Sequence, residues 1–359
     1  MKRIVLTAVA LIVVACPKSE PPPPAASTPA PAAAPAAITQ MPKFESAPLL
    51  DHIKKLSSDE FEGRGPGTKG EELTVKYLED AFKNIGLKPG NTDGSYIQKV
   101  PMVGITATNT APLTIASGAT RRTFKWKEEV VAWTKHVADG ASIADSDIIF
   151  AGYGVTAPEF NWDDFKGVDV KGKTIMVFVN DPQVPDPADP SRLDQKTFNG
   201  KAMTYYGRWT YKFEEGARRG AAGVLIVHET GPAGYPFQVV QGNLNEKFDL
   251  VTPDKNMGRA AIEGWVTLDT AKAILKMGGQ DFDALKKQSI TREFKPVPLN
   301  LKASMAIKNT MRTLDSRNVL GKLEGSDPKL RDEYVIYTAH WDHLGIGAPV
   351  KGDKIYNGA

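Results

Sequence analysis

The sequence has little of several features that would quickly assign a protein to a class. It contains one cysteine, Cys16, among 359 residues, so the chain cannot form an internal disulfide. Its 45 lysines and arginines are interleaved with 42 acidic residues, and a net charge of +3 provides no long basic face, which argues against nucleic acid as a partner. No repeat period is visible. With 41% hydrophobic and 24% charged residues, the composition is that of an ordinary globular protein of about two domains.

The amino terminus has the pattern of an export signal. Two basic residues precede an apolar segment over residues 4–14, which is too short to span a membrane as a helix. The motif Val-Val-Ala-Cys at 13–16 resembles a bacterial lipobox, whose cysteine is acylated and becomes the mature amino terminus. We therefore expect 1–16 to be a lipoprotein signal peptide with Cys16 as its lipidation site; a plain secretory signal is the alternative. The protein would then be exported to the bacterial cell envelope and lie lipid-anchored at a membrane surface or in the periplasm.

Residues 17–42 consist mainly of Pro, Ala, Ser and Thr, with four successive prolines at 21–24. This composition favours extended polyproline conformers and cannot bury a core. We expect a tether that holds the folded part away from the membrane surface.

Two helices are predicted at the start of the folded part. Apolar residues at helical spacing predict the first over 47–56. A capping box begun by Thr68 and a stop at Gly86 predict the second between those two residues. The glycine-rich stretch 59–67 predicts a tight turn, which is either a loop approaching a substrate cleft or an ordinary connector.

From about residue 112 to 300 the pattern favours strands. Short apolar or alternating runs are bounded by turn residues, and one helix precedes the last of them. The predicted strands are 123–127, 148–150, 174–179 and 224–227, and the predicted helix is 210–219.

Polar residues in this middle region do not form a recognisable catalytic cluster. His136 and His228 are isolated, and an isolated histidine is more often a hydrogen-bonded structural residue than a metal ligand. Asp163 and Asp164 are adjacent, so on a strand they would point to opposite faces. We expect them to lie in a solvated turn.

The last part of the chain returns to α/β character. After a predicted linker over 302–316, strands are predicted over 318–325 and 333–339, and the second leads directly into His340 and Asp342. In open α/β sheets, sites collect just beyond the carboxyl ends of strands. Imidazole is a good zinc ligand, and a carboxylate two residues further along can hydrogen-bond to the ring and orient it.

Three interpretations compete for the His-Trp-Asp-His motif at 340–343. It can be a structural histidine capped by a carboxylate. It can belong to a metallo-β-lactamase-type hydrolase, whose pattern resembles His-x-His-x-Asp-His, although Thr338 here replaces the first histidine. It can also belong to a co-catalytic di-zinc exopeptidase.

Several stretches resemble the last of these families, the zinc aminopeptidases related to bacterial leucine aminopeptidases and to glutamate carboxypeptidase. The region 112–300, with Gly-Tyr-Gly-Val at 152–155, is similar to the protease-associated domain that many of these enzymes insert. The stretches that carry the resemblance to the peptidase itself are 56–68, 316–319, 338–343 and 357–359.

The resemblance implies an α/β fold, in which a zinc-exopeptidase sheet-and-helix domain is interrupted by a mostly β protease-associated domain. The implied organisation is a signal peptide at 1–16, a linker at 17–42, the first peptidase part at 43–111, the inserted domain at 112–300 and the continued peptidase domain at 301–359.

The resemblance also implies a function, the hydrolysis of amino-terminal residues from a peptide substrate by water that two zinc ions activate. His340 matches the first zinc ligand, and Asp342, assigned as a catalytic residue, matches the supporting acidic residue beside it. The other ligands and the glutamate base of the family would lie beyond residue 359, so we expect the amino-terminal portion of a longer enzyme, inactive by itself. The alternative function is a non-catalytic surface lipoprotein that binds peptide or protein through the inserted domain.

Overall fold

The computed structural model describes residues 43–242 and 246–358, and Cys16 and the predicted tether lie outside them. The chain divides into two units, residues 1–51 and 52–359. None of the helices in the described ranges is long and apolar enough to cross a membrane.

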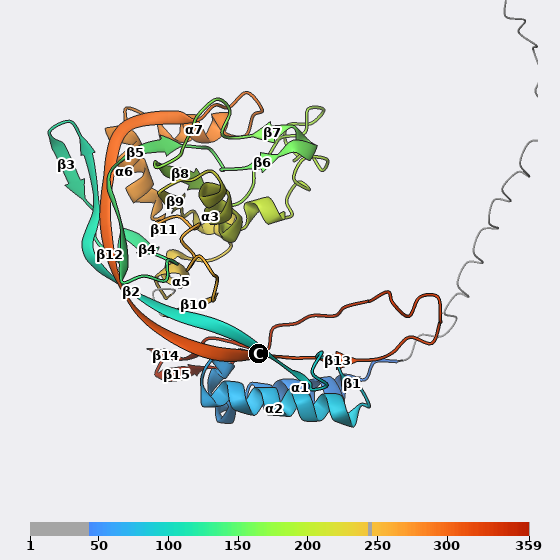
Figure 1. Cartoon of the computed structure of the whole chain (residues 1–359). Helices are drawn as coiled ribbons and strands as arrows, with labels where there is room; N and C mark the ends of the chain where they lie inside the picture. The colour runs from blue at the N-terminus through green and yellow to red at the C-terminus, as the bar shows by residue number, and fades with distance from the viewer. Residues whose placement is uncertain (1–42, 243–245, 359) are drawn as a thin grey trace, which may run out of the picture. The chain divides into compact units, whose positions relative to one another are not determined.

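Both helices predicted near the start are present. They are α1 (Ser46–Leu56) and α2 (Lys69–Asn84), separated by the 3-10 helix η1 (Asp59–Arg64) (Figure 1). The Thr68 side chain caps α2 by accepting a hydrogen bond from the Gly70 main chain over 3.1 Å. In the usual capping box, the Glu71 carboxylate would accept a hydrogen bond from the N–H of the capping residue, Thr68. Here it accepts from the N–H of the preceding residue, Gly67.

The main part of the structure is a mixed sheet, and the fold class is α/β as the sequence predicts. β5, β8, β9 and β11 pair in parallel, and the other neighbours pair antiparallel. The strand order is β10 (Lys247–Leu250), β2 (Ile97–Ser117), β12 (Val297–Val319), β5 (Gly140–Phe150), β8 (Thr174–Phe178), β9 (Gly223–Val227), β11 (Ile262–Val266) and β4 (Val130–Trp133), with β3 (Thr120–Thr123) against β2.

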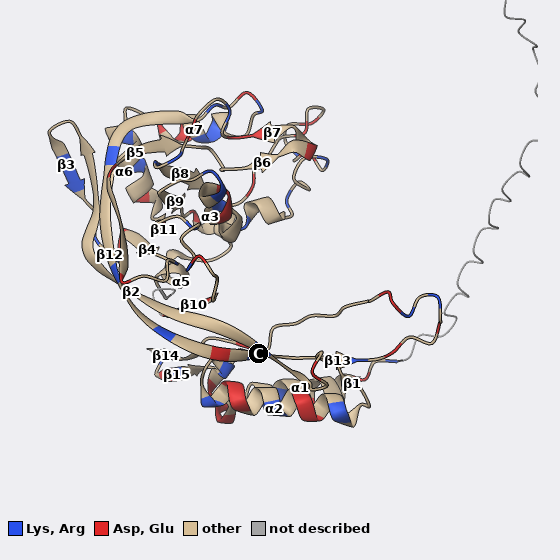
Figure 2. Ribbon diagram, in the orientation of Figure 1, with Lys and Arg blue, Asp and Glu red and all other residues tan. Residues whose placement is uncertain are grey.

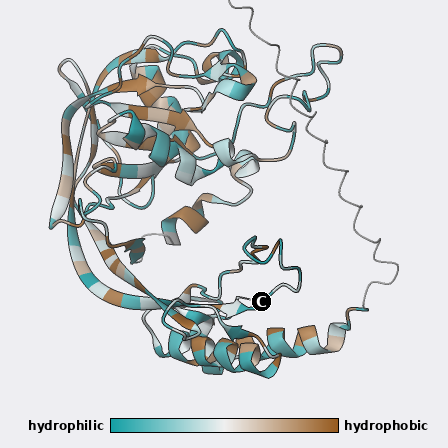
Figure 3. Ribbon diagram, turned by 45° about the vertical axis from the view of Figure 1, so that its right-hand side comes forward, coloured by the Kyte–Doolittle hydropathy of each residue, from teal (hydrophilic) through white to brown (hydrophobic). Residues whose placement is uncertain are grey.

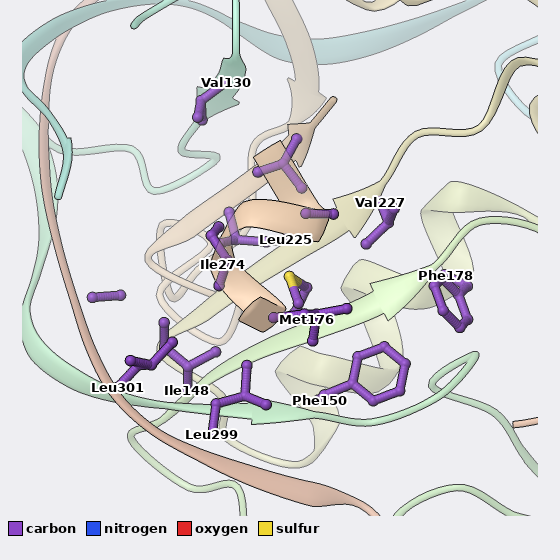
Figure 4. Packing of buried hydrophobic residues seen from close by; sticks show 14 of the residues in the cluster. Val130, Ile148, Phe150, Met176, Phe178, Leu225, Val227, Ile274, Leu299 and Leu301 are labelled. Atoms are coloured by element: carbon purple, nitrogen blue, oxygen red, sulfur yellow. The ribbon is translucent and has the colours of Figure 1, made fainter. Parts of the chain in front are cut away.

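Each face of the parallel strands buries its own core, which explains their continuous apolar sequences. On one face, Met176 and Leu225 pack with Ile274 of α6 (Leu268–Met277), next to α7 (Phe282–Gln288) (Figure 4). On the other, Ile175 and Val224 pack with Phe213 of α3 (Trp209–Arg218). Figure 3 shows hydrophobic segments in both strands and helices. Three of the four strands predicted in this region and its helix are therefore confirmed, whereas 123–127 is mostly irregular.

The long strand β12 corrects the predicted linker over 302–316. It pairs with β2 from Ile97 opposite Val319 to Ala116 opposite Lys302. Between Leu301 and Ile307, buried apolar residues alternate with the more exposed Lys302, Ser304 and Ala306. The prediction was wrong because the polar half of a half-buried strand was taken for linker composition. The predicted boundaries near 111 and 300 fall inside β2 and β12, and the division into domains remains a prediction.

The predicted strand over 333–339 is also wrong. These residues have no regular secondary structure, and Val335 and Tyr337 are 85% and 94% exposed. A strand persists only where its main chain pairs with a neighbour, and no other segment of the described residues pairs with this one. The predicted strand 318–325 is reduced to the end of β12 and β13.

Charged residues of both signs are scattered along the ribbon (Figure 2).

The remaining elements are short. The elements are β1 (Lys88–Pro89), paired with β13 (Gly321–Lys322); β14 (Gly345–Val350), paired with β15 (Asp353–Tyr356); β6 (Thr156–Ala157), paired with β7 (Trp162–Asp163); η2 (Pro158–Phe160), η3 (Tyr205–Gly207), α4 (Thr230–Ala233) and α5 (Phe237–Gly242).

Candidate functional site

The predicted contact between His340 and Asp342 is present. His340 Nδ1 lies 2.8 Å from the Asp342 main-chain oxygen and 3.2 Å from its carboxylate oxygen Oδ1. When Nδ1 carries the ring hydrogen and donates it to Asp342, Nε2 holds the lone pair that a metal ligand needs. The His340 side chain is 80% exposed, so Nε2 is accessible.

The segment that carries these residues is fixed by Arg64, at the end of η1. Its guanidinium Nε donates to the Trp341 main-chain oxygen over 3.0 Å. Nη1 donates to the oxygens of Asn357, over 2.8 Å, and of Leu56, and Nη2 donates to that of Gly358 over 3.2 Å. One buried side chain thus joins the nearby Leu56 to two segments that are distant in sequence, at 341 and at 357–358.

The turn that presents Arg64 has an unusual main chain. Glu62, Gly63 and Arg64 have φ values of 49°, 65° and 53°, in the left-handed region. A Cβ at Gly63 would lie 2.5 Å from the Tyr356 oxygen and 2.6 Å from the Gly345 oxygen. The sequence therefore needs glycine there for both conformation and space. Positive φ values at Gly63 and Gly67 agree with the interpretation of the stretch 59–67 as a connector, and its approach to a substrate cleft remains a prediction.

Further hydrogen bonds bring the same segments together. The Trp341 indole donates to the Arg317 main-chain oxygen over 2.8 Å, and His343 N–H donates to the Arg64 oxygen over 3.1 Å. The Asn357 side chain donates to the Ser57 oxygen over 2.8 Å and to the Asp59 carboxylate over 2.9 Å. The four stretches that resemble the di-zinc exopeptidases, 56–68, 316–319, 338–343 and 357–359, therefore meet in one place through their described residues.

Charges in this place act on one another. Burial lowers the pKa of Arg64, and the nearby Asp342 carboxylate opposes that change. Partial burial lowers the pKa of His343, and the positive charge of Arg64 adds to the effect. The lowered pKa of His343 favours its neutral form, whereas Arg64 stays charged because the ordinary pKa of a guanidinium is far above neutral pH.

His340 is the residue of this site that we predict to bind a metal ion, and it would supply one ligand. No group of three or more His, Cys, Asp and Glu residues suited to a metal ion occurs within 43–242 and 246–358. Since zinc takes three or four protein ligands, His340 fits as one member of a ligand set and not as the whole set. Its role as a zinc ligand, and that of Asp342 as its support, remain predictions.

Arg64 is the residue that sequence reasoning missed. It stands alone among glycines in the stretch 59–67, and that isolation was its signal. Its partners at 341, 357 and 358 are too distant in sequence to be found from local patterns.

The prediction of a solvated turn at Asp163 and Asp164 is wrong for Asp164. This residue is 1% exposed and accepts hydrogen bonds from Tyr153 N–H over 3.1 Å, Val155 N–H over 3.0 Å and the Trp162 indole over 2.8 Å. Burial raises its pKa, and the buried ammonium of Lys212 opposes that change. Of two adjacent carboxylates in a turn, one can be buried and the other exposed, and composition alone does not show which.

The two isolated histidines are structural, as predicted. His136 Nε2 lies 2.9 Å from the Arg259 main-chain oxygen, and His228 Nε2 lies 3.1 Å from that of Tyr235. Both are buried. Burial lowers the pKa of His228.

Comparison with solved structures finds several peptidases that are similar to this chain. No protein-family model and no curated protein matches it. An aminopeptidase from Aneurinibacillus sp. strain AM-1 is similar with 16% identity and a TM-score of 0.33, over 79% of this chain and 50% of that one. The zinc aminopeptidase BSAP from Bacillus subtilis is similar with 14% identity and a TM-score of 0.29, over 80% and 49%. A peptidase M28 precursor from Shewanella amazonensis SB2B is similar with 12% identity and a TM-score of 0.28, over 78% and 54%. The chain spans about half the length of these solved structures.

Proposed function

We propose that this chain is part of a zinc-dependent exopeptidase, an aminopeptidase that removes amino-terminal residues from peptides. The observation that supports this best is the convergence of the four resembling stretches around Arg64, with His340 held by Asp342. The metallo-β-lactamase interpretation has no such support, because Thr338 cannot replace the missing imidazole.

The residues of this chain have positioning roles in the proposed site. Asp342 accepts the Nδ1 hydrogen of His340, which fixes the ring and directs Nε2 outward. Arg64 fixes the main chain of two segments, at Trp341 next to that ring and at Asn357. When bound, paired zinc ions would supply an activated water and polarise the scissile carbonyl. The remaining ligands would come from residues other than those described, so the activity is proposed for the whole protein.

We also propose that the protein is lipid-anchored at Cys16 and exported. The supporting observation is the lipobox-like motif at 13–16, followed by the Pro/Ala-rich stretch 17–42. A Cys16→Ala variant expressed in a bacterial host should move from the detergent phase to the aqueous phase of a Triton X-114 partition. An unchanged partition would contradict the anchor.

The activity is tested with the protein expressed from its full gene. Wild type should release p-nitroaniline from aminoacyl p-nitroanilides and not from their N-acetylated forms. His340→Gln should lower kcat/KM by at least about a hundredfold, as loss of a metal ligand does. His52→Gln, at an exposed histidine that hydrogen-bonds Tyr77, is the matched control and should retain the wild-type rate. Equal rates in His340→Gln and wild type would contradict the proposal.

A further inference from the structure

A second candidate site lies in the region of the predicted inserted domain, and its lining residues do not include His340 or Asp342. A cleft of about 630 Å³ opens just beyond the carboxyl ends of β5, β8 and β9, and one wall is α7. Tyr153 follows β5, Asp181 follows β8, and Gly231 follows β9. This is the edge of a parallel sheet at which ligands bind in α/β folds, and the volume suits a small molecule.

Tyr153 provides a hydrogen-bond donor in this cleft. It is held between Gly152 and Gly154, whose φ values of 54° and 63° require glycine. The buried Asp164 carboxylate fixes the same turn by accepting from Tyr153 N–H. The tyrosine is only 4% exposed, yet its hydroxyl makes no hydrogen bond within the part of the chain that the structure describes. Burial raises its pKa, so the hydroxyl keeps its hydrogen.

Two lysines of the cleft are available for an anion. Lys201 comes from the loop after β8 and Lys287 from α7, where Figure 2 shows basic residues. Both are exposed, and neither forms an ion pair with any described residue. The neighbouring Lys286 is different, because it pairs with Glu229. Lys201, Lys287 and the buried Tyr153 thus line one cleft.

Acidic side chains line the same cleft and restrict its ligand. Asp181 is fully buried and accepts from Thr204 N–H over 2.8 Å and from its hydroxyl over 2.6 Å. Asp283 is exposed in the first turn of α7 and has no ion pair among the described residues. A phosphate dianion would be repelled by these carboxylates, whereas a carboxylate with an amino group at its other end matches both signs.

We infer that this cleft binds a zwitterion, a free amino acid or a short peptide. Lys201, Lys287 and the Tyr153 hydroxyl would bind the carboxylate, and Asp283 would face the amino group. The inference rests on residues that take no part in the proposed metal site, and it therefore stands independently of peptidase activity.

Isothermal titration of the full chain, in buffer with EDTA to prevent metal-dependent hydrolysis, tests this inference. The probes are trialanine, trialanine amide and inorganic phosphate. Trialanine should bind with a Kd below about 10 mM, and the amide should bind about tenfold more weakly because it lacks the carboxylate. Phosphate should bind more weakly than trialanine.

Variants test whether trialanine binds in the cleft or elsewhere on the surface. Lys201→Gln and Lys287→Gln should each weaken trialanine binding by about five- to tenfold, and Tyr153→Phe should do so while keeping the ring packing. Lys171→Gln, an exposed lysine before the amino end of β8, is the control and should bind like wild type. A thermal melt confirms that each variant is folded. Equal binding of acid and amide, wild-type binding by both lysine variants, phosphate binding as tight as trialanine, or no binding of trialanine would overturn the inference.

Discussion

Arg64 Nε donates a hydrogen bond to the main-chain oxygen of Trp341 over 3.0 Å, across 277 residues of sequence. This bond places a glycine-rich turn near the start of the folded part directly against the His340 segment. Because Arg64 also binds the oxygens of Leu56, Asn357 and Gly358, one side chain contacts several of the segments that form the candidate site.

Arg64→Met should therefore destabilise the protein. The variant leaves four main-chain oxygens without their donor, and hydrogen bonds to a charged group contribute about 1.5–3 kcal/mol each at most. We expect the free energy of unfolding to fall by about 2–4 kcal/mol in urea denaturation. Lys69→Met, at a neighbouring exposed lysine with only a 3.9 Å contact to Glu62, should change it by less than about 0.5 kcal/mol. Equal effects of the two variants would show that Arg64 does not hold these segments.

Gly63→Ala tests the close approach of the same turn to β14 and β15. The new Cβ would meet two main-chain oxygens, at Tyr356 and Gly345, in addition to the cost of a φ of 65°. Gly94 is the matched control, because its φ is 83° but nothing lies within 4 Å of a Cβ built there. We expect Gly94→Ala to cost about 1 kcal/mol and Gly63→Ala at least about 2 kcal/mol more, by urea denaturation. Similar costs would mean that the turn can move away.

Asp164 and Lys212 should be energetically coupled. Both are buried, burial raises the pKa of Asp164 and lowers that of Lys212, and each side chain's charge opposes the shift of the other. Lys212 Nζ has no hydrogen-bond partner among the described residues. Asp164→Asn and Lys212→Met should each lower the free energy of unfolding by about 2–4 kcal/mol. The double variant should lose at least about 1 kcal/mol less than the sum, and strict additivity would rule out the coupling.

Protonation of His228 should destabilise the protein in mild acid. Burial lowers the pKa of His228 in the folded state below its ordinary value of 6.5, so the unfolded chain binds more protons. Stability that is present above pH 6.5 is then lost as the pH falls through the lowered pKa. In urea denaturation at pH 7.5 and about pH 5, His228→Gln should show a smaller loss than wild type. An identical loss in both proteins would assign the acid sensitivity to other groups.

Local sequence signals predicted the elements that depend on local interactions. Thr68 predicted the start of α2 because its capping hydrogen bond joins residues two apart. The apolar runs around 174–179 and 224–227 predicted buried strands because a parallel sheet covers both of their faces.

Features that depend on distant partners could not be predicted in this way. The run 333–339 has a strand's composition, but pairing decides whether it is a strand, and composition does not supply a neighbour. The burial of Asp164 depends on donors at Tyr153 and Val155, in a separate turn. Of the candidate site, the sequence predicted the contact between His340 and Asp342, and it missed Arg64.

The central claim is that His340 is a zinc ligand, and metal analysis of the protein expressed from its full gene tests it most directly. After dialysis against metal-free buffer, inductively coupled plasma mass spectrometry should find about two zinc ions per wild-type chain, as paired-metal hydrolases hold. His340→Gln should lose at least one of them, Asp342→Asn should bind more weakly by about ten- to a hundredfold, and His52→Gln should match wild type. Full zinc retention by His340→Gln, or no zinc in wild type, would contradict the account.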